Sequence, residues 1–206
     1  MATLYTFNNK LVKINNKFIQ KYVEPEPPTP PGPTFDEVTI GNQIWMSKNL
    51  AIDDGQGGIY TRTVNYGQGD VVEHYYTWEA AVRVAASITG WHFPTNDEWN
   101  TLASTIGGAS VAGNKLKSTY GWEYDYDHDR SGGGTDEYGF GAFPAGYYVN
   151  EYGDYSQVRD SAKFWTANNF STTEGLGKQM NSTSYSMSYD YYQKLDALTV
   201  RLIKDS

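Results

Sequence analysis

The sequence predicts an α+β domain over residues 34–206, preceded by a small β meander at residues 1–23 and a proline-rich linker at residues 24–33. Three observations lead to this prediction. Six of the eight prolines lie between residues 24 and 33. Two later segments have the apolar spacing of amphipathic helices. The rest of the chain is rich in glycine, tyrosine and short alternating runs, which are typical of strands and long loops.

The first segment repeats the tripeptide Asn-Asn-Lys at residues 8–10 and 15–17, between short β-prone runs. Asparagine tolerates positive φ, so each repeat is typical of a hairpin turn and the segment predicts a three-stranded meander. A flexible tail is the alternative. The meander is favoured by apolar side chains that a tail would not need: Phe7, Leu11, Ile14, Phe18 and Ile19. So small a sheet cannot bury a core alone, and we expect it to pack on other copies of the chain or on a larger assembly.

The segment EPEPPTPPGP, residues 24–33, separates this meander from the rest of the chain. Proline fixes φ and removes a hydrogen-bond donor, so the segment is expected to be an extended polyproline II spacer of roughly 3 Å per residue. It therefore predicts two modules joined by a semi-rigid linker.

Two helices are predicted after the linker. The segment TWEAAVRVAAS, residues 77–87, places Ala81, Val84 and Ala85 at helical spacing. The segment PTNDEWNTLAS, residues 94–104, has Thr95 near its start, followed three residues later by Glu98. This is the spacing of a capping box, in which the two residues satisfy each other's backbone N–H groups.

Composition excludes several classes of protein. The formal net charge of −8 repels phosphate backbones, so we expect no nucleic-acid partner. The absence of cysteine excludes disulfides, thiolate metal sites and cysteine nucleophiles. No segment approaches the ~20 apolar residues that span a bilayer, so membrane insertion is not expected. The first ten residues also lack the basic and apolar regions of a secretory signal.

The densest polar segment is DYDHDRSGGGTDEYG, in which four aspartates resemble the alternating oxygen ligands of a calcium loop: Asp125, Asp127, Asp129 and Asp136. The EF-hand pattern needs glycine at its sixth position and glutamate at its twelfth, where this chain has Arg130 and Asp136. We therefore expect an acidic surface loop and no cofactor, with a calcium site as the alternative. No motif for a catalytic nucleophile, a dinucleotide loop or a histidine metal site is present in the sequence.

Seven short segments occur in an order that closely resembles the Fibrobacter succinogenes major paralogous domain family: IGNQIWMSKNL, YTWEAA, GWHFPTNDEW, AGNKLKST, GTDEYGFGAFPAGY, FWTANN and LTVRLIKD. The resemblance covers residues 36–206. It implies a C-type-lectin-like fold, similar to that of formylglycine-generating enzymes and retroelement variable proteins, with two helices, a small twisted antiparallel sheet and long loops. Formylglycine-generating enzymes depend on cysteines, so the resemblance does not extend to their activity.

The resemblance also implies a binding surface between FWTANN and the closing VRL segment, residues 167–199. This interval contains NSTSYSMSYDYY, whose tyrosines and serines have the composition of antibody binding loops. The predicted ligand-contacting residues are Asn168, Asn169, Tyr185, Ser186, Ser188, Tyr189, Tyr191 and Tyr192. The alternative is that Tyr185, Met187, Tyr189 and Tyr191, which alternate, form the inward face of a strand. We expect Met187 and some of the rings to be in the core.

Together these observations favour a non-catalytic adhesin or receptor-binding module that recognises a cell-surface glycan or protein. The lack of a leader, the meander and the spacer favour a phage fibre or capsid decoration protein on the virion surface. It would attach to other virion proteins through residues 1–23, as a homo-oligomer for which a trimer is one candidate. The first alternative is an adhesin or lipoprotein domain on the bacterial cell surface. The second is a glycan-active enzyme, which would need two carboxylates facing each other in a pocket.

Overall fold

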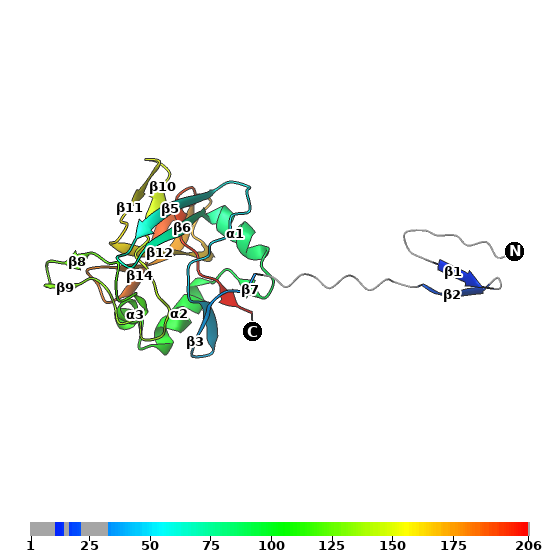
Figure 1. Cartoon of the computed structure of the whole chain (residues 1–206), viewed down its shortest axis with the longest axis horizontal. Helices are drawn as coiled ribbons and strands as arrows, with labels where there is room; N and C mark the ends of the chain where they lie inside the picture. Colours follow the sequence, from blue (N-terminus) through cyan, green and yellow to red (C-terminus); the bar gives the residue numbers. More distant parts are fainter. Residues whose placement is uncertain (1–10, 15–16, 22–32, 206) are drawn as a thin grey trace. The chain divides into compact units, whose positions relative to one another are not determined.

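A computed structural model describes residues 11–14, 17–21 and 33–205 of the chain (Figure 1). The chain divides into two units, Met1–Gly32 and Pro33–Ser206, which are described separately. In the first unit, β1 (Leu11–Ile14) and β2 (Lys17–Lys21) pair antiparallel, with Ile14 opposite Lys17. Two antiparallel strands thus lie on either side of residues 15–16 of the second Asn-Asn-Lys repeat, where the sequence predicts a hairpin. The other strand and turn of the predicted meander, and the linker as far as residue 32, lie outside the described residues.

The second unit is an α+β domain, as predicted. Its described residues form three helices and several antiparallel sheets that curl around two large hydrophobic clusters and a third, smaller one. A five-stranded sheet has the order β11 (Asp154–Ser156), β10 (Tyr147–Val149), β15 (Ala197–Leu198), β6 (Asp70–Thr77), β5 (Ile59–Asn65). A four-stranded sheet has the order β3 (Glu37–Ile40), β4 (Gln43–Met46), β16 (Ile203–Lys204), β7 (Trp91–His92). A two-stranded hairpin joins β8 (Tyr124–Asp125) and β9 (Arg130–Ser131).

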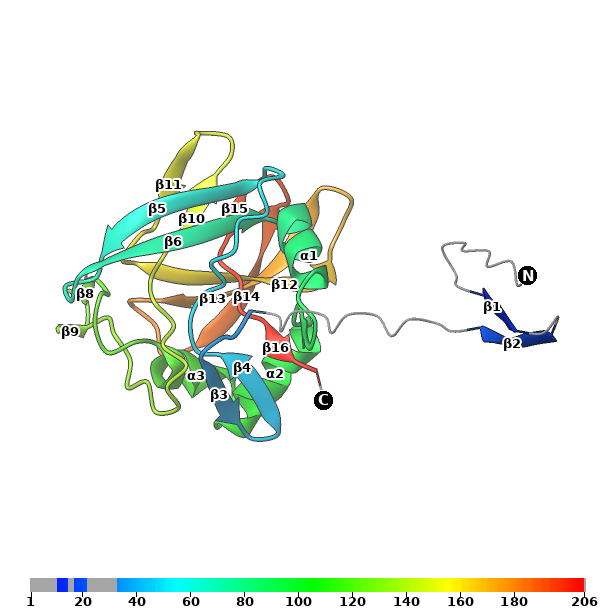
Figure 2. The same ribbon diagram turned by 45° about the vertical axis from the view of Figure 1, so that its right-hand side comes forward.

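The remaining sheet consists of β12 (Ser161–Asn169), β13 (Glu174–Asn181) and β14 (Met187–Gln193), in that order. Figure 2 shows it in the middle of the domain, with β5, β6 and α1 (Trp78–Ala86) to one side and α2 (Asn96–Thr105) and α3 (Ala109–Leu116) to the other. Each face of this sheet therefore belongs to a different hydrophobic cluster.

Both predicted helices are present, and local sequence explains them. The Thr77 hydroxyl accepts a hydrogen bond from the Ala80 N–H and caps α1, whose apolar face is buried. Thr95 and Glu98 form the predicted capping box of α2.

The prediction of only two helices was wrong, because α3 was missed. This helix has only eight residues, no side-chain cap and a glycine in its interior, all of which weaken its sequence signal. Tertiary packing explains Gly113: a Cβ there would collide with the carbonyl oxygen of Ser186, so only glycine lets α3 approach the segment before β14.

A buried arginine joins the C-terminal segment to the core. Arg201 is fully buried, and its Nη1 donates to the carbonyl oxygens of Met46 (2.9 Å) and Phe140 (2.6 Å). Its Nε donates to Asn49 Oδ1 at 2.8 Å, and its guanidinium carbon lies 4.6 Å from the centre of the Phe140 ring. Burial lowers its pKa to about 9. These bonds hold three distant chain segments together beneath the sheets.

Candidate functional site

Strand β14 contains four of the eight predicted ligand-contacting residues and forms one edge of the three-stranded sheet. It pairs antiparallel with β13, with Tyr189 opposite Lys178 and Tyr191 opposite Leu176. Since side chains alternate along a strand, Tyr189 and Tyr191 project from one face and Tyr192 projects from the other. The predicted cluster of tyrosines is therefore divided between two environments.

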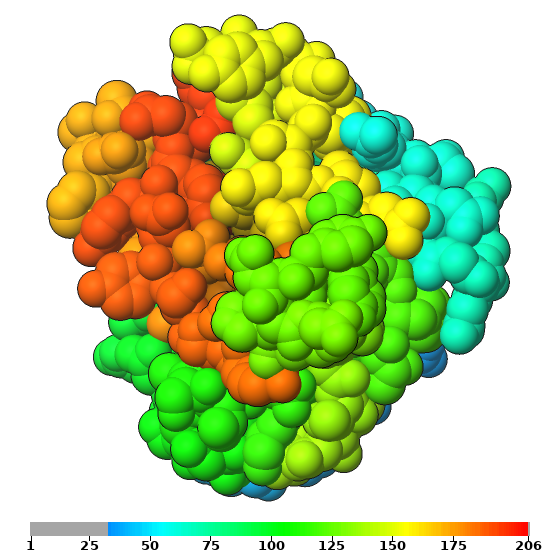
Figure 3. Space-filling model, turned by 90° about the vertical axis from the view of Figure 1, so that its left-hand side faces the viewer, coloured from blue at the N-terminus to red at the C-terminus, as the bar shows by residue number. Residues whose placement is uncertain are grey.

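The first face carries an exposed group of aromatic rings. Tyr189 is 59% exposed and Tyr191 is 41% exposed. The Phe170 ring, 59% exposed, lies against Tyr191 with 4.0 Å between ring centres, and Tyr189 lies 6.1 Å from Tyr191. We call Phe170, Tyr189 and Tyr191 the aromatic patch. In Figure 3, β14 and the turn between β12 and β13 form neighbouring areas along the left side of the surface.

Helices α2 and α3 cover only part of the face of the sheet that carries Tyr189 and Tyr191. Met187 is buried near α3 and packs in the core, as expected for one member of the alternating set. Beyond it, the Lys178 ammonium donates to Asn100 Oδ1 of α2 at 2.9 Å, and it lies 5.8 Å from the centre of the Tyr189 ring. Burial lowers the pKa of Lys178. The aromatic patch therefore lies next to the contact between Lys178 and Asn100 of α2.

Sequence reasoning missed Phe170. It lies in the turn between β12 and β13, where its N–H donates to the Glu174 carbonyl oxygen at 3.1 Å. The sequence did contain an indication of its exposure. Phe170 lies between the polar residues Asn169 and Ser171, so it is not part of an apolar run of the kind that forms a buried strand.

The inclusion of Tyr192 in the predicted surface is corrected by the structure. Tyr192 is only 7% exposed and packs edge-on against Trp165, with 5.9 Å between ring centres. Its hydroxyl donates to Gln179 Oε1 (2.9 Å) and accepts from Lys163 Nζ (2.8 Å). The reason is strand alternation. Tyr192 lies opposite Gly175, on the face of the sheet that packs in the hydrophobic cluster containing the buried side of α1, which we call the α1 cluster.

Lys163 is the buried cation of this second face. Its ammonium lies 4.7 Å from the ring centres of both Tyr147 and Tyr192. Burial lowers its pKa to about 8. The charge is stabilised by aromatic faces and by neutral hydrogen-bond acceptors.

Tyr185 belongs to another cluster, beside the hairpin β8–β9. Its ring is 48% exposed and stacks on Arg130, whose guanidinium carbon lies 3.9 Å from the ring centre. Arg130 also donates to the Thr183 carbonyl oxygen at 3.0 Å. Figure 3 shows the green β8–β9 region directly beside the segment that leads into β14. Tyr185 is therefore exposed, as predicted, but faces the acidic loop.

Three of the four aspartates of the acidic loop accept hydrogen bonds from protein donors, and Asp127 is exposed. The buried Asp125 carboxylate accepts from His128 Nδ1 and Arg130 Nε, both at 2.9 Å. Its burial alone would raise its pKa, but these two bonds outweigh burial and the pKa is lowered. Asp129 accepts from the Tyr124 hydroxyl, and Asp136 accepts from the Gly141 N–H. Over the described residues, no three His, Asp or Glu side chains are placed to hold one metal ion.

The other predicted residues are arranged around β14. Asn168 Oδ1 accepts from the Asn96 N–H at 2.6 Å and so satisfies a free donor at the start of α2. The Ser186 hydroxyl lies 2.8 Å from that of Ser184. Asn169 and Ser188 are exposed.

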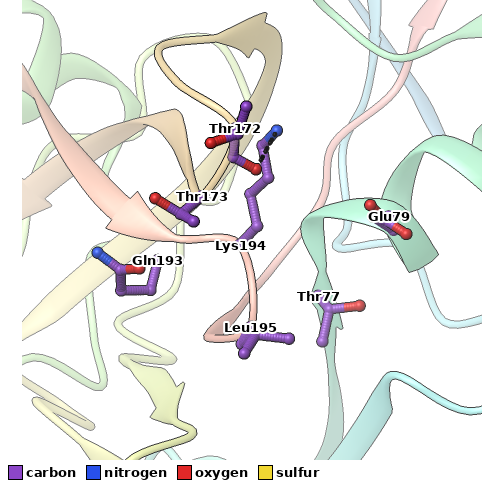
Figure 4. A pocket seen from close by; sticks show the side chains of 7 residues that line it. All are labelled: Thr77, Glu79, Thr172, Thr173, Gln193, Lys194 and Leu195. Atoms are coloured by element: carbon purple, nitrogen blue, oxygen red, sulfur yellow. Dashed lines mark hydrogen bonds between the residues drawn. The ribbon is translucent and has the colours of Figure 1, made fainter.

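A pocket of about 320 Å³ lies between the end of β14, the turn after β12 and the start of α1 (Figure 4). Its lining residues are Thr77, Glu79, Thr172, Thr173, Gln193, Lys194 and Leu195. Lys194 Nζ donates to the Thr172 carbonyl oxygen at 3.3 Å and lies 4.6 Å from the centre of the Trp78 ring.

The family model of the Fibrobacter succinogenes major domain matches residues 38–204. The chain belongs to this family. The matched region begins in β3 and ends in β16, two strands that flank β4 in one sheet. The first and last strands of the matched region therefore both pair with β4. The search of curated proteins and that of solved structures each found no match. No described helix is long and apolar enough to cross a membrane.

Proposed function

We propose that this protein is a non-catalytic binding module whose aromatic patch contacts a receptor, a glycan or a protein, on a cell surface. The observation that carries the proposal is the exposure of Phe170, Tyr189 and Tyr191 side by side on a sheet edge. The proposal includes a C-type-lectin-like fold for residues 34–206, which the family resemblance and the α+β architecture support.

Physical chemistry gives the reason for assigning binding to this patch. Exposed aromatic rings in contact with one another leave apolar area in water, which is unfavourable unless a partner covers it. Phe170 adds a ring with no polar atom, so no hydrogen bond to water offsets its exposure. Tyrosine supplies large contact area for few rotatable bonds, which lowers the entropy lost on binding. The underlying strand is paired along its length with β13, so the rings are held on a rigid support.

The remaining parts of the proposal concern display. We propose that residues 1–23 attach the chain to a larger particle as a homo-oligomer and that the linker at residues 24–33 extends the head from it. A virion surface is the location we favour, and a bacterial cell surface is the alternative. The β1–β2 hairpin and the six prolines between residues 24 and 33 support this arrangement. Several heads on one particle would bind with avidity, so that weak single contacts suffice.

The proposal is tested with the fluorescently labelled full chain on a panel of bacterial cells that includes Fibrobacter succinogenes. Tyr191→Ala is compared with Tyr152→Ala, which removes a 75% exposed ring from the turn between β10 and β11. Loss of a binding anchor costs about 2 kcal/mol, so Tyr191→Ala is expected to lower the affinity roughly thirtyfold and Tyr152→Ala to leave it unchanged. Equal binding by the two variants would contradict the assignment of the site.

A further inference from the structure

The pocket and the aromatic patch both draw residues from β14 and from the turn after β12, which bears on the kind of receptor. We infer that the site continues from the aromatic patch into the pocket and takes an uncharged, unbranched oligosaccharide of about three or more sugar units. This inference rests on the proposed function and specifies its ligand class.

The strand itself sets the spacing of the site. Tyr189, Tyr191 and Gln193 are alternate residues of β14 and project from the same face at intervals of about 7 Å. Gln193 donates through Nε2 to Glu174 Oε1 at 3.2 Å and lines the pocket. Three successive positions therefore lead from the outer tyrosine to the pocket, which suits a chain with a regular repeat.

The turn after β12 connects the patch to the pocket on the other side. Phe170 and Thr173 both belong to this turn: the Phe170 ring contacts Tyr191, and Thr173 lines the pocket. The Lys194 N–H donates to the Thr173 carbonyl oxygen at 2.8 Å, so β14 and the turn are joined up to the pocket. The turn after β12 thus contributes Phe170 to the aromatic patch and Thr173 to the pocket.

The aromatic patch and the pocket differ in chemistry in the same way as the apolar face and the hydroxyl rim of a sugar. A pyranose has C–H groups on one face, which pack on aromatic rings, and hydroxyl groups around its rim. The pocket offers the hydroxyl groups of Thr77 and Thr173, a carboxylate from Glu79 and an ammonium from Lys194, with Leu195 as an apolar wall. Figure 4 shows the helix residues and the strand residues on opposite sides of the opening. Carboxylates accept from sugar hydroxyls and ammonium groups donate to them.

Charge argues for an uncharged ligand. Lys194 and Glu79 both line the pocket, so either sign of ligand charge would meet a like charge there. The chain as a whole carries −8, which disfavours acidic polysaccharides. The Lys194 ammonium has three donors, and the Thr172 carbonyl oxygen accepts one of them. The pocket volume of about 320 Å³ lies at the small end for ligand pockets, as expected for a single sugar unit.

The test uses the full chain and three series of oligosaccharides from one to six units: cello-, malto- and chito-oligosaccharides. Affinity is measured by titration calorimetry for the wild type, Tyr191→Ala, Lys194→Met and the control Tyr152→Ala. In the series that binds, we expect affinity to rise up to about three units and then level off. Lys194→Met should abolish the gain from the added units, about tenfold, while Tyr191→Ala should weaken binding at every length and Tyr152→Ala should change nothing. Melting temperatures should stay within about 2 °C of the wild type, because Tyr152 and Tyr191 are exposed and Lys194→Met keeps the aliphatic stem of a half-buried side chain.

Different failures identify different errors. If single sugars bind as tightly as hexamers and Lys194→Met has no effect, the extension into the pocket is wrong, while a Tyr191-dependent affinity keeps the proposed function. If no series binds but cells are bound through Tyr191, the oligosaccharide class is wrong and a protein receptor takes its place. If Tyr191→Ala affects neither sugars nor cells, the proposed function itself is wrong. Glu79→Gln, which keeps the shape of the side chain, checks Lys194→Met by an independent change in the same pocket.

Discussion

Tyr191 and Tyr192 are neighbours in the chain but have opposite surroundings. The Tyr191 ring is 41% exposed and packs against the other rings of the aromatic patch. Tyr192 is 7% exposed and packs against Trp165, with its hydroxyl bonded to Lys163 and Gln179. The difference arises because one face of β14 meets the α1 cluster and the other extends beyond the cover of α2 and α3. The same residue type thus contributes to stability on one face and, by our proposal, to binding on the other.

The largest expected effect is on stability, from the inner ring. Tyr192→Ala should lower the free energy of unfolding by about 3–5 kcal/mol, since it leaves a cavity beside Trp165 and removes the hydroxyl that Lys163 uses. Tyr192→Phe keeps the ring and should cost only about 1 kcal/mol. Urea denaturation of both variants measures this. A Tyr192→Ala protein as stable as the wild type would show that the inner face is not packed as described.

The outer rings should behave in the opposite way. Tyr189→Ala and Phe170→Ala should each change the free energy of unfolding by less than about 1 kcal/mol, because their rings are mostly exposed already. Each should weaken binding to cells by about 1–2 kcal/mol, that is roughly fivefold to thirtyfold. Denaturation and cell binding are measured on the same preparations. A large stability loss with unchanged binding would remove the distinction between the two faces.

The buried lysine predicts a pH dependence of the inner face. Burial lowers the pKa of Lys163 from 10.5 in the unfolded chain to about 8 in the folded protein. Between these values the unfolded chain binds more protons, so this residue makes stability rise with pH, by roughly 1 kcal/mol between pH 8 and pH 9. Lys163→Met should remove that part of the slope. The difference between wild type and variant at several pH values isolates it from other titrating groups, and parallel slopes would contradict it.

The smallest effect is expected at Lys178, which lies between α2 and the aromatic patch. Its ammonium bonds Asn100 of α2 and approaches the Tyr189 ring. Lys178→Met keeps the aliphatic stem and should change the free energy of unfolding by less than about 1 kcal/mol. The variant loses the hydrogen bond to Asn100, but it no longer has to bury a charge, and these two effects oppose each other. Asn100→Ala is the matched control, because it leaves the buried ammonium without its acceptor and should cost more. Equal losses in the two variants would mean that the ammonium has another acceptor.

The comparison also shows which parts of the fold local sequence could predict. The capping box of α2 involves Thr95 and Glu98, which are three residues apart, so the helix start was visible in the sequence. The alternation of residues in β14 was equally visible. In contrast, α3 has no cap, and the glycine that weakens its signal is required by a contact with Ser186, far along the chain.

The sequence by itself determined the family, the α+β class and which residues of β14 share a face, because these depend on short-range spacing and on the order of motifs. Tertiary structure alone decided which face is covered. It placed Tyr192 against Trp165, put Phe170 against Tyr191, and paired Asp125 with His128 and Arg130 in the acidic loop. The physical reason is that burial depends on neighbours contributed by distant segments, and a strand's alternation is identical whether a helix covers one face, the other, or neither.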